Sequence, residues 1–182
     1  MRYRLLFIVV CIVFQQSVYA QSKEDEMIYR FINQVLSENS NRKITYLEDD
    51  FSFNPIDGNL SRNYHLNHAD SAAVANKMKT YHHYHPDEKK LIHIKTVSSK
   101  KIHDCFEISI NRSNAWSCIH NELKIPHGFF HISVPIFFDD NKKAIFSYGY
   151  HCGSLCGDGG VYIYENIKGK WVKTVVLSEW IS

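Results

Sequence analysis

The stretch FHISVPIFFDDNKKAIFSYGY, residues 130–150, decides the fold. Apolar and more polar residues alternate in its first part, and a period of two is typical of a β-strand; the apolar set is Phe130, Ile132, Val134 and Ile136. The polar residues 139–143 predict a hairpin loop, and residues 144–150 predict the returning strand. We therefore expect two antiparallel strands here.

Two more strands are expected soon after this hairpin. Residues 161–164 and 170–177 are rich in β-branched and aromatic side chains, and Asn166-Ile-Lys-Gly169 predicts the turn between them. We interpret Asp158-Gly-Gly160 as a flexible turn before the third strand, because glycine permits tight backbone conformations. Strands that are consecutive and closely spaced most simply pair as an antiparallel meander.

Two helices are predicted nearer the N-terminus. A helix over residues 22–38, with Ser22 as its N-cap, places these apolar side chains on one face: Ile28, Phe31, Ile32, Val35 and Leu36. A second helix is expected from about Asp70 to His82, and Pro86 prevents its continuation because proline lacks the backbone N–H.

Shorter strands complete the prediction. They cover residues 43–47, 91–97 and Cys105–Ile110, with a loop over residues 50–67 and a turn near Asn111–Asn114. Helices that precede a run of strands favour an α+β domain. We therefore predict a single α+β domain over residues 21–182, in which the N-terminal helix and the second helix pack on a mainly antiparallel, meander-type sheet.

Residues 1–20 have the pattern of a cleavable signal peptide. Arg2 and Arg4 supply a positive start, Leu5–Phe14 is an unbroken apolar run, and Val18-Tyr19-Ala20 ends with the small residue of a cleavage site. The apolar run is too short to cross a bilayer, which takes about 20 helical residues. We expect cleavage after Ala20 and an exported protein, either periplasmic or secreted.

The charge of the remaining chain excludes some classes of partner. The whole chain has 21 Lys and Arg residues against 19 Asp and Glu residues, and Arg2 and Arg4 belong to the predicted signal. The mature chain is then balanced with its histidines neutral, which argues against a nucleic-acid partner. No later segment approaches about 18 consecutive apolar residues, so no membrane span is expected in the mature chain. The partner would be an unidentified protein or a small ligand.

The cysteines of the mature chain predict two disulfides. An even number of cysteines in an oxidising compartment favours bridges, and these are Cys105, Cys118, Cys152 and Cys156. Glycines inside and after the segment between Cys152 and Cys156 allow the small ring that this pair would close. We prefer Cys152–Cys156 with Cys105–Cys118, although spacing does not exclude the crossed pairings.

A histidine cluster is a candidate metal site. His82, His83 and His85 lie within four residues, and imidazole is a common ligand of zinc and copper. The competing interpretation is a solvated helix end, where protonated histidines interact favourably with the helix dipole. The cluster thus supports an alternative function, a metal-binding protein or a metal-dependent enzyme.

Two other kinds of catalytic chemistry are weaker hypotheses. A thiolate at Cys152 or Cys156 with His151 as its base is suited to acyl transfer, but bridged sulfurs are not nucleophiles. Asp139 and Asp140 are neighbours in a hairpin loop, whereas glycosidases need carboxylates that face each other across a cleft. Asp158 alone is too few ligands for calcium.

Aromatic residues are concentrated in the predicted sheet. A curved sheet lined by such rings can hold a small ligand, and the candidates for contact are Tyr148, Tyr150, Tyr162 and Trp171, with Phe129, Phe130, Tyr164 and Trp180 nearby. The alternative interpretation is a core built from large residues. Both interpretations place the rings on the sheet.

The last third of the chain resembles a known group of proteins. The resemblance rests on three segments: the loop Cys152-Gly-Ser-Leu-Cys156-Gly, the turn Gly169-Lys-Trp171 and the end Trp180-Ile-Ser182. This pattern resembles uncharacterised small exported proteins of Bacteroidetes-type bacteria, which share a Cys-Gly-x2-Cys-Gly loop, a Gly-Lys-Trp turn and a closing Trp-hydrophobic-Ser. The resemblance implies export and a hairpin-rich C-terminal sheet, and it implies no activity.

Together these patterns favour an exported, non-catalytic binding or interaction domain with structural disulfides. No cofactor is expected from the sequence, and no motif in it dictates a reaction.

Overall fold

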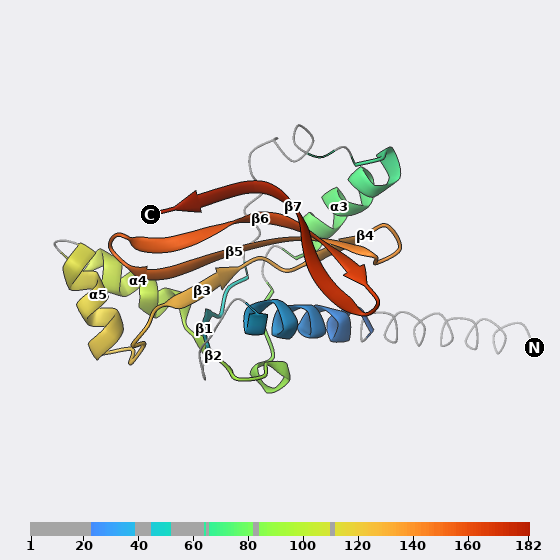
Figure 1. The fold of residues 1–182 in the computed structure, drawn as a ribbon. Coiled ribbons are helices and arrows are strands. Elements are labelled where there is room, and N and C mark those ends of the chain that lie inside the picture. Colours follow the sequence, from blue (N-terminus) through green and yellow to red (C-terminus); the bar gives the residue numbers. More distant parts are fainter. Residues whose placement is uncertain (1–22, 39–44, 52–63, 65, 82–83, 110–111) are drawn as a thin grey trace, which may run out of the picture.

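The computed structural model describes residues 23–38, 45–51, 64, 66–81, 84–109 and 112–182. The predicted signal peptide, Ser22 and residues 43–44 of the first predicted strand lie outside these residues. The described chain has the predicted α+β architecture, with helices on both faces of one twisted sheet (Figure 1). No helix among the described residues is long and apolar enough to cross a membrane.

Seven strands form the sheet. Their order is β2-β1-β3-β5-β6-β7, and β4 pairs with β5 beside β3. The strand bounds are β1 Thr45–Glu48, β2 Ile94–Val97, β3 Phe129–Ile132, β4 Ile136–Phe138, β5 Lys143–Gly153, β6 Cys156–Ile167 and β7 Lys170–Ile181. The predicted strand 130–136 is therefore two strands, separated by residues 133–135, and Pro135 between them has no backbone N–H for a sheet hydrogen bond.

The predicted meander is confirmed by β5, β6 and β7, which pair antiparallel in sequence order. The turn after β6 is also confirmed, and Gly169 has the positive φ of 87° that favours glycine. The turn predicted at Asp158-Gly-Gly160 is wrong, because these residues lie within β6. Gly159 pairs there with Gly149 of β5 and Trp180 of β7.

The parallel part of the sheet was not predicted. β1 pairs parallel with β2 over its whole length and parallel with β3 at Leu47 and Phe130. Parallel neighbours need long crossover connections. The β1–β2 connection contains helix α3 (His68–Thr80) and the short 3-10 helix η1 (Glu88–Lys90), whereas the β2–β3 connection contains helices α4 (Ser99–Glu107) and α5 (Arg112–Asn121).

The helix over residues 23–38 covers one face of the sheet, which we call the first face (Figure 1). Its predicted apolar side chains are confirmed as core residues: Ile28, Phe31, Ile32, Val35 and Leu36. Phe31 has no exposed surface and meets the rings of Phe146 and Trp171 edge-on, at centroid distances of 5.0 and 5.2 Å. Gln34 exchanges two hydrogen bonds with the backbone of Trp171, which fixes the helix against β7.

The other face of the sheet, the second face, is covered by three helices. Helix α3 places Val74 against Ile145 and Ile163. Helices α4 and α5 lie together at the end of the sheet where β5 turns into β6 (Figure 1). They pack on Phe129 of β3 through a separate apolar cluster: Ile102, Cys105, Trp116, Ile119 and Ile125.

Helices α4 and α5 correct the prediction for this segment. We expected a strand at Cys105–Ile110 and a turn at Asn111–Asn114, but Cys105 lies in α4 and Asn114 lies in α5. Ile102, Cys105 and Phe106 have the three- and four-residue spacing of one helix face. This spacing starts at Ile102, whereas the predicted strand started at Cys105. The prediction therefore cut the helical pattern in the middle and missed the helix.

Candidate disulfide-braced cavity

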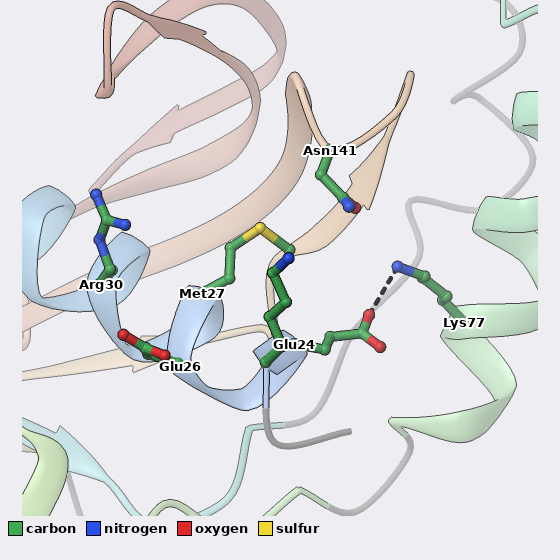
Figure 2. Close-up of a pocket in the computed structure, with 7 residues that line it drawn as sticks. Glu24, Glu26, Met27, Arg30, Lys77 and Asn141 are labelled. Carbon is green, nitrogen blue, oxygen red and sulfur yellow. Dashed lines mark hydrogen bonds and ion pairs between the residues drawn. The ribbon is translucent and has the colours of Figure 1, made fainter. Parts of the chain in front are cut away.

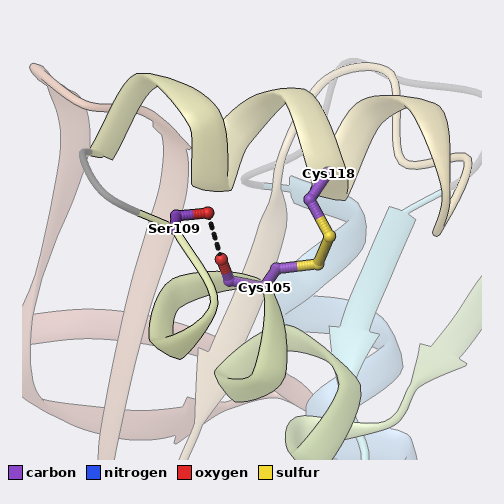
Figure 3. The surroundings of a disulfide bond; sticks show 3 residues. All are labelled: Cys105, Ser109 and Cys118. Carbon is purple, nitrogen blue, oxygen red and sulfur yellow. Dashed lines mark hydrogen bonds between the residues drawn. A yellow bond between two sulfur atoms is a disulfide. The ribbon is translucent and has the colours of Figure 1, made fainter.

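Both predicted disulfides are confirmed in the preferred pairing. Cys105 of α4 is joined to Cys118 of α5 with a Cα–Cα distance of 5.7 Å (Figure 3). Ser109 follows α4 and donates a hydrogen bond of 2.6 Å from its hydroxyl to the carbonyl oxygen of Cys105. The bridge therefore fixes α4 and α5 to each other at the end of the sheet.

The second disulfide closes the hairpin between β5 and β6. Cys152 and Cys156 are four residues apart, with a Cα–Cα distance of 5.1 Å. Because both sulfurs are bonded to each other, neither is a thiolate, and the acyl-transfer hypothesis with His151 as base has no nucleophile at this position. The bridge instead fixes the backbone next to His151.

A cavity of about 290 Å³ lies between α4 and the second face of the sheet, and we call it the α4 cavity. Strands β1, β3 and β5 contribute one lining residue each, and α4 contributes four; the lining is Glu48, Phe129 and His151 with Ser99, Ile102, His103 and Phe106. Two of these positions adjoin disulfides, since Phe106 follows Cys105 and His151 precedes Cys152. Both bridges thus brace walls of the same cavity.

The end of β1 positions one wall of the α4 cavity. Asp49 accepts hydrogen bonds from the backbone N–H and the hydroxyl of Ser99, at 2.8 and 2.9 Å, so its carboxylate holds the first residue of α4. Glu48, one residue earlier, points to the second face and lies 2.6 Å from Nδ1 of His131. The Glu48 side chain is only 15% exposed. Consecutive carboxylates therefore serve two purposes, helix attachment and cavity lining.

Stacked rings fix the opposite wall. Phe129 and His151 are paired across β3 and β5, and their ring centroids are 5.4 Å apart. Trp116 stacks on the far side of Phe129 at 6.0 Å, and Trp180 lies on the far side of His151 at 5.5 Å. Burial is the main cause that lowers the pKa of His151 below 6.5, and the charge of His131 lowers it further, whereas Glu48 and Asp158 oppose the shift. The imidazole of His151 is accordingly neutral at pH 7.

Glycines make room for Trp180 beside this ring. A Cβ atom at Gly149 would lie 3.0 Å from the Trp180 indole, and one at Gly159 would lie 2.8 Å from it. The second face is therefore flat where Trp180 crosses it, and the indole can rest on the backbone of β5 and β6. The indole thereby lies beside the His151 ring, at a centroid distance of 5.5 Å.

A second, larger cavity of about 540 Å³ lies between the start of the first helix and α3 (Figure 2). Its lining includes Met27 and Asn141 together with side chains of both charges: Lys23, Glu24, Glu26, Arg30 and Lys77. Glu24 and Lys77 already form an ion pair of 2.7 Å across it. Burial raises the pKa of Glu24, but hydrogen bonds from Lys77 and Tyr81 and the Lys77 charge lower it overall. This mixture of charges points to no single class of ligand.

The aromatic residues predicted to contact a ligand lie elsewhere. Tyr148, Tyr162 and Trp171 are buried in the core of the first face, as the alternative interpretation expected. Tyr150 is half-buried at the edge of that core, and its hydroxyl donates to the carbonyl oxygen of His127. None of these four side chains belongs to the lining of the two cavities given above.

The predicted metal site is only partly within the described residues. His82 and His83 lie outside them, while His85 is exposed, and its Nδ1 lies 3.1 Å from the carbonyl oxygen of Asp49. Among the residues that the structure describes, no three His, Cys, Asp or Glu side chains are placed to hold a metal ion. The metal-binding function of His82, His83 and His85 stays a prediction.

The carboxylates considered for catalysis are also apart from the α4 cavity. Asp139 and Asp140 lie in the β4–β5 turn with positive φ values of 51° and 53°, and Asp139 forms an ion pair of 3.3 Å with Lys143. Asp158 is exposed within β6. Their positions agree with the interpretation of the first two as turn residues.

Sequence reasoning identified only part of the cavity lining. Phe129 was among the aromatic candidates, and His151 was considered only as a base for a cysteine. Glu48, Ser99 and the apolar side chains of α4 were missed. The available signal was modest: Glu48 is an acidic residue directly after a predicted strand, and such strand ends commonly carry site residues.

Comparison with known proteins adds no relative. No family model, no curated sequence and no solved structure matches the chain. The resemblance of the last third to exported Bacteroidetes-type proteins therefore stays a prediction.

Proposed function

We propose that this chain is an exported binding protein whose two disulfides brace a small-ligand site, the α4 cavity. The observation that carries this proposal is the position of the bridges. Cys105 holds the helix that contributes Phe106, and Cys152 holds the strand that contributes His151, both of which line the cavity. Bracing of this kind lowers the entropic cost of binding because the walls are already ordered.

Three further features support a binding role. The cavity lining combines three apolar side chains, Ile102, Phe106 and Phe129, with four polar ones, and polar groups that converge beside apolar and aromatic side chains are typical of small-molecule sites. Disulfides persist in oxidising compartments, and the signal pattern of residues 1–20 would deliver the chain to one. The four sulfur atoms serve as cross-links and not as thiolate nucleophiles, and we propose binding without catalysis.

The test begins with the full chain expressed in a bacterium that has a periplasm. We expect periplasmic protein whose intact mass fits cleavage after Ala20 and two formed disulfides. That protein is then screened with a fragment library by NMR, and hits should shift the amide signals of Ile102, Phe106 and Phe129. Uncleaved cytoplasmic protein with free thiols would contradict export.

Two tryptophan variants show whether hits occupy the α4 cavity. His103→Trp places a large side chain at the cavity lining, whereas Lys101→Trp makes the same kind of change at an exposed position of α4 outside the lining. Hits should weaken about tenfold or more in His103→Trp and should be unchanged in Lys101→Trp, since an occluded pocket loses its contacts. A library without a single hit at these residues would contradict the binding role.

A further inference from the structure

The α4 cavity contains a carboxylate that is largely removed from water. Glu48 is 15% exposed, and His131 contacts only its Oε2 atom. Among the described residues, no donor is bonded to Oε1. A buried carboxylate is costly unless hydrogen-bond donors or a positive charge surround it. The Glu48 carboxylate therefore lines the cavity with one oxygen held by His131 and the other accessible to a further donor.

Aromatic rings stand beside this carboxylate. Phe129 and Phe106 both line the cavity. Trp116 and His151 cover the two sides of Phe129, so this ring supplies apolar contact, and Phe106 is the lining ring that can offer its face to a ligand. The face of an aromatic ring attracts a cation, and this attraction is stronger where water is excluded. The aromatic side of the cavity and the Glu48 carboxylate thus both favour a ligand with a positive charge.

The cavity lining supplies no permanent positive charge, and the positive charge next to Glu48 is that of His131 when protonated, whose Nδ1 lies 2.6 Å from Oε2. The lining has no Lys or Arg side chain, and on α4 the ammonium group of Lys100 is engaged by Asp104 at 2.7 Å. His103 lies 2.9 Å from Glu107 at an exposed position, so any positive charge on it is balanced. The pKa of His151 is lowered, so its ring remains uncharged at pH 7.

We infer that the α4 cavity binds a small organic cation, an amine carried on an apolar or aromatic body, with Glu48 as its counter-charge. This inference rests on the proposed binding function and adds the class of ligand. The cavity of about 290 Å³ equals the volume of about ten water molecules. An arylalkylamine is of that size, and an anion of the same size would be repelled by Glu48.

The test compares three ligands that differ mainly in charge: phenethylamine, 2-phenylethanol and phenylacetate. Binding to the oxidised, full-length mature protein is measured at pH 7 by NMR titration of the signals of Phe106 and Phe129. Phenethylamine should bind about tenfold tighter than 2-phenylethanol, and phenylacetate should bind weakest, because water weakens the attraction between close opposite charges less in a partly desolvated site than in bulk solvent. Equal or tighter binding of the alcohol or the acid would overturn the inference.

Two variants assign the preference to Glu48. Glu48→Gln should bind phenethylamine and 2-phenylethanol about equally, since the amide keeps the size of the side chain and removes its charge. Glu88→Gln is the matched control, because it removes one negative charge at the exposed helix η1 and should keep the preference. A preference that survives in folded Glu48→Gln would contradict the assignment to Glu48. If that variant does not fold, the three-ligand series on the parent protein alone decides the ligand class.

Failure of the inference and failure of the proposed function give different results. If none of the three probes perturbs the cavity signals while library hits still bind there, the ligand class is wrong and the binding function stands. If the library also gives no hit at Ile102, Phe106 and Phe129, the proposed function fails with it.

Discussion

The two faces of the sheet are covered in different ways. On the first face one helix, residues 23–38, lies over a continuous apolar core in which Phe31 meets four aromatic rings. On the second face the cover is divided between α3 and the α4–α5 pair, and the surface between them holds glycines and histidines. A closed face serves stability, whereas an interrupted face leaves room for a site.

This comparison predicts that stability depends mainly on the first face. Phe31→Ala removes a side chain without exposed surface and should lower the free energy of unfolding by about 3–5 kcal/mol, since the cavity cannot fully close. Phe106→Ala, on the second face and 39% exposed, is the control and should cost about 1 kcal/mol. Urea unfolding followed by circular dichroism measures both, and similar losses would remove the distinction between the faces.

The two disulfides should contribute different amounts to the stability of the second face. Cys105 and Cys118 are 13 residues apart, whereas Cys152 and Cys156 are 4 apart. Closing a longer loop removes more entropy from the unfolded chain, so the Cys105→Ser/Cys118→Ser variant should lose about 3 kcal/mol and the Cys152→Ser/Cys156→Ser variant about 2 kcal/mol. Urea unfolding of the two double variants gives the order. An equal or reversed order would show that native contacts, and not loop length, set the contribution.

Elements with local sequence signals could be predicted from the sequence, whereas pairings between distant segments could not. The meander of β5, β6 and β7 was predictable because alternation and turn residues are local signals. The apolar face of residues 23–38 was predictable for the same reason. The parallel pairing of β1 with β2 and β3 was not, since long crossovers join these strands and no local pattern records them.

The α4 cavity was harder to predict than the fold. Glu48, Phe129 and His151 come from three strands far apart in the sequence, and only the sheet order brings them together. The aromatic residues that stood out in the sequence were mostly core residues, because large rings fill the first face. The preferred disulfide pairing was correct, although spacing left the crossed pairings open. Its position beside the cavity was not predicted, because the end of α4 was interpreted as a strand over Cys105–Ile110.

The smallest expected effect concerns the pH dependence of the second face. Burial lowers the pKa of His151 below its usual 6.5, so the folded protein binds this proton less readily than the unfolded chain does. The unfolded state then carries more protons just below pH 6.5, and the free energy of unfolding must fall as the pH decreases through that value. The stabilising contribution of neutral His151 is therefore present at neutral pH and is lost on acidification, until the folded protein also becomes protonated.

A ring-preserving substitution isolates this contribution from the other histidines. His151→Phe keeps a ring between Phe129 and Trp180 but cannot be protonated, so it should lose less stability than the parent between about pH 7.5 and about pH 5.5. His103→Phe is the control, because its side chain is 69% exposed and should leave the parent's pH dependence nearly unchanged. Urea unfolding at both pH values gives the difference for each protein. If His151→Phe and the parent lost the same stability, the neutral imidazole would contribute nothing to the second face, and acid sensitivity would have to arise from histidines outside the ring stack.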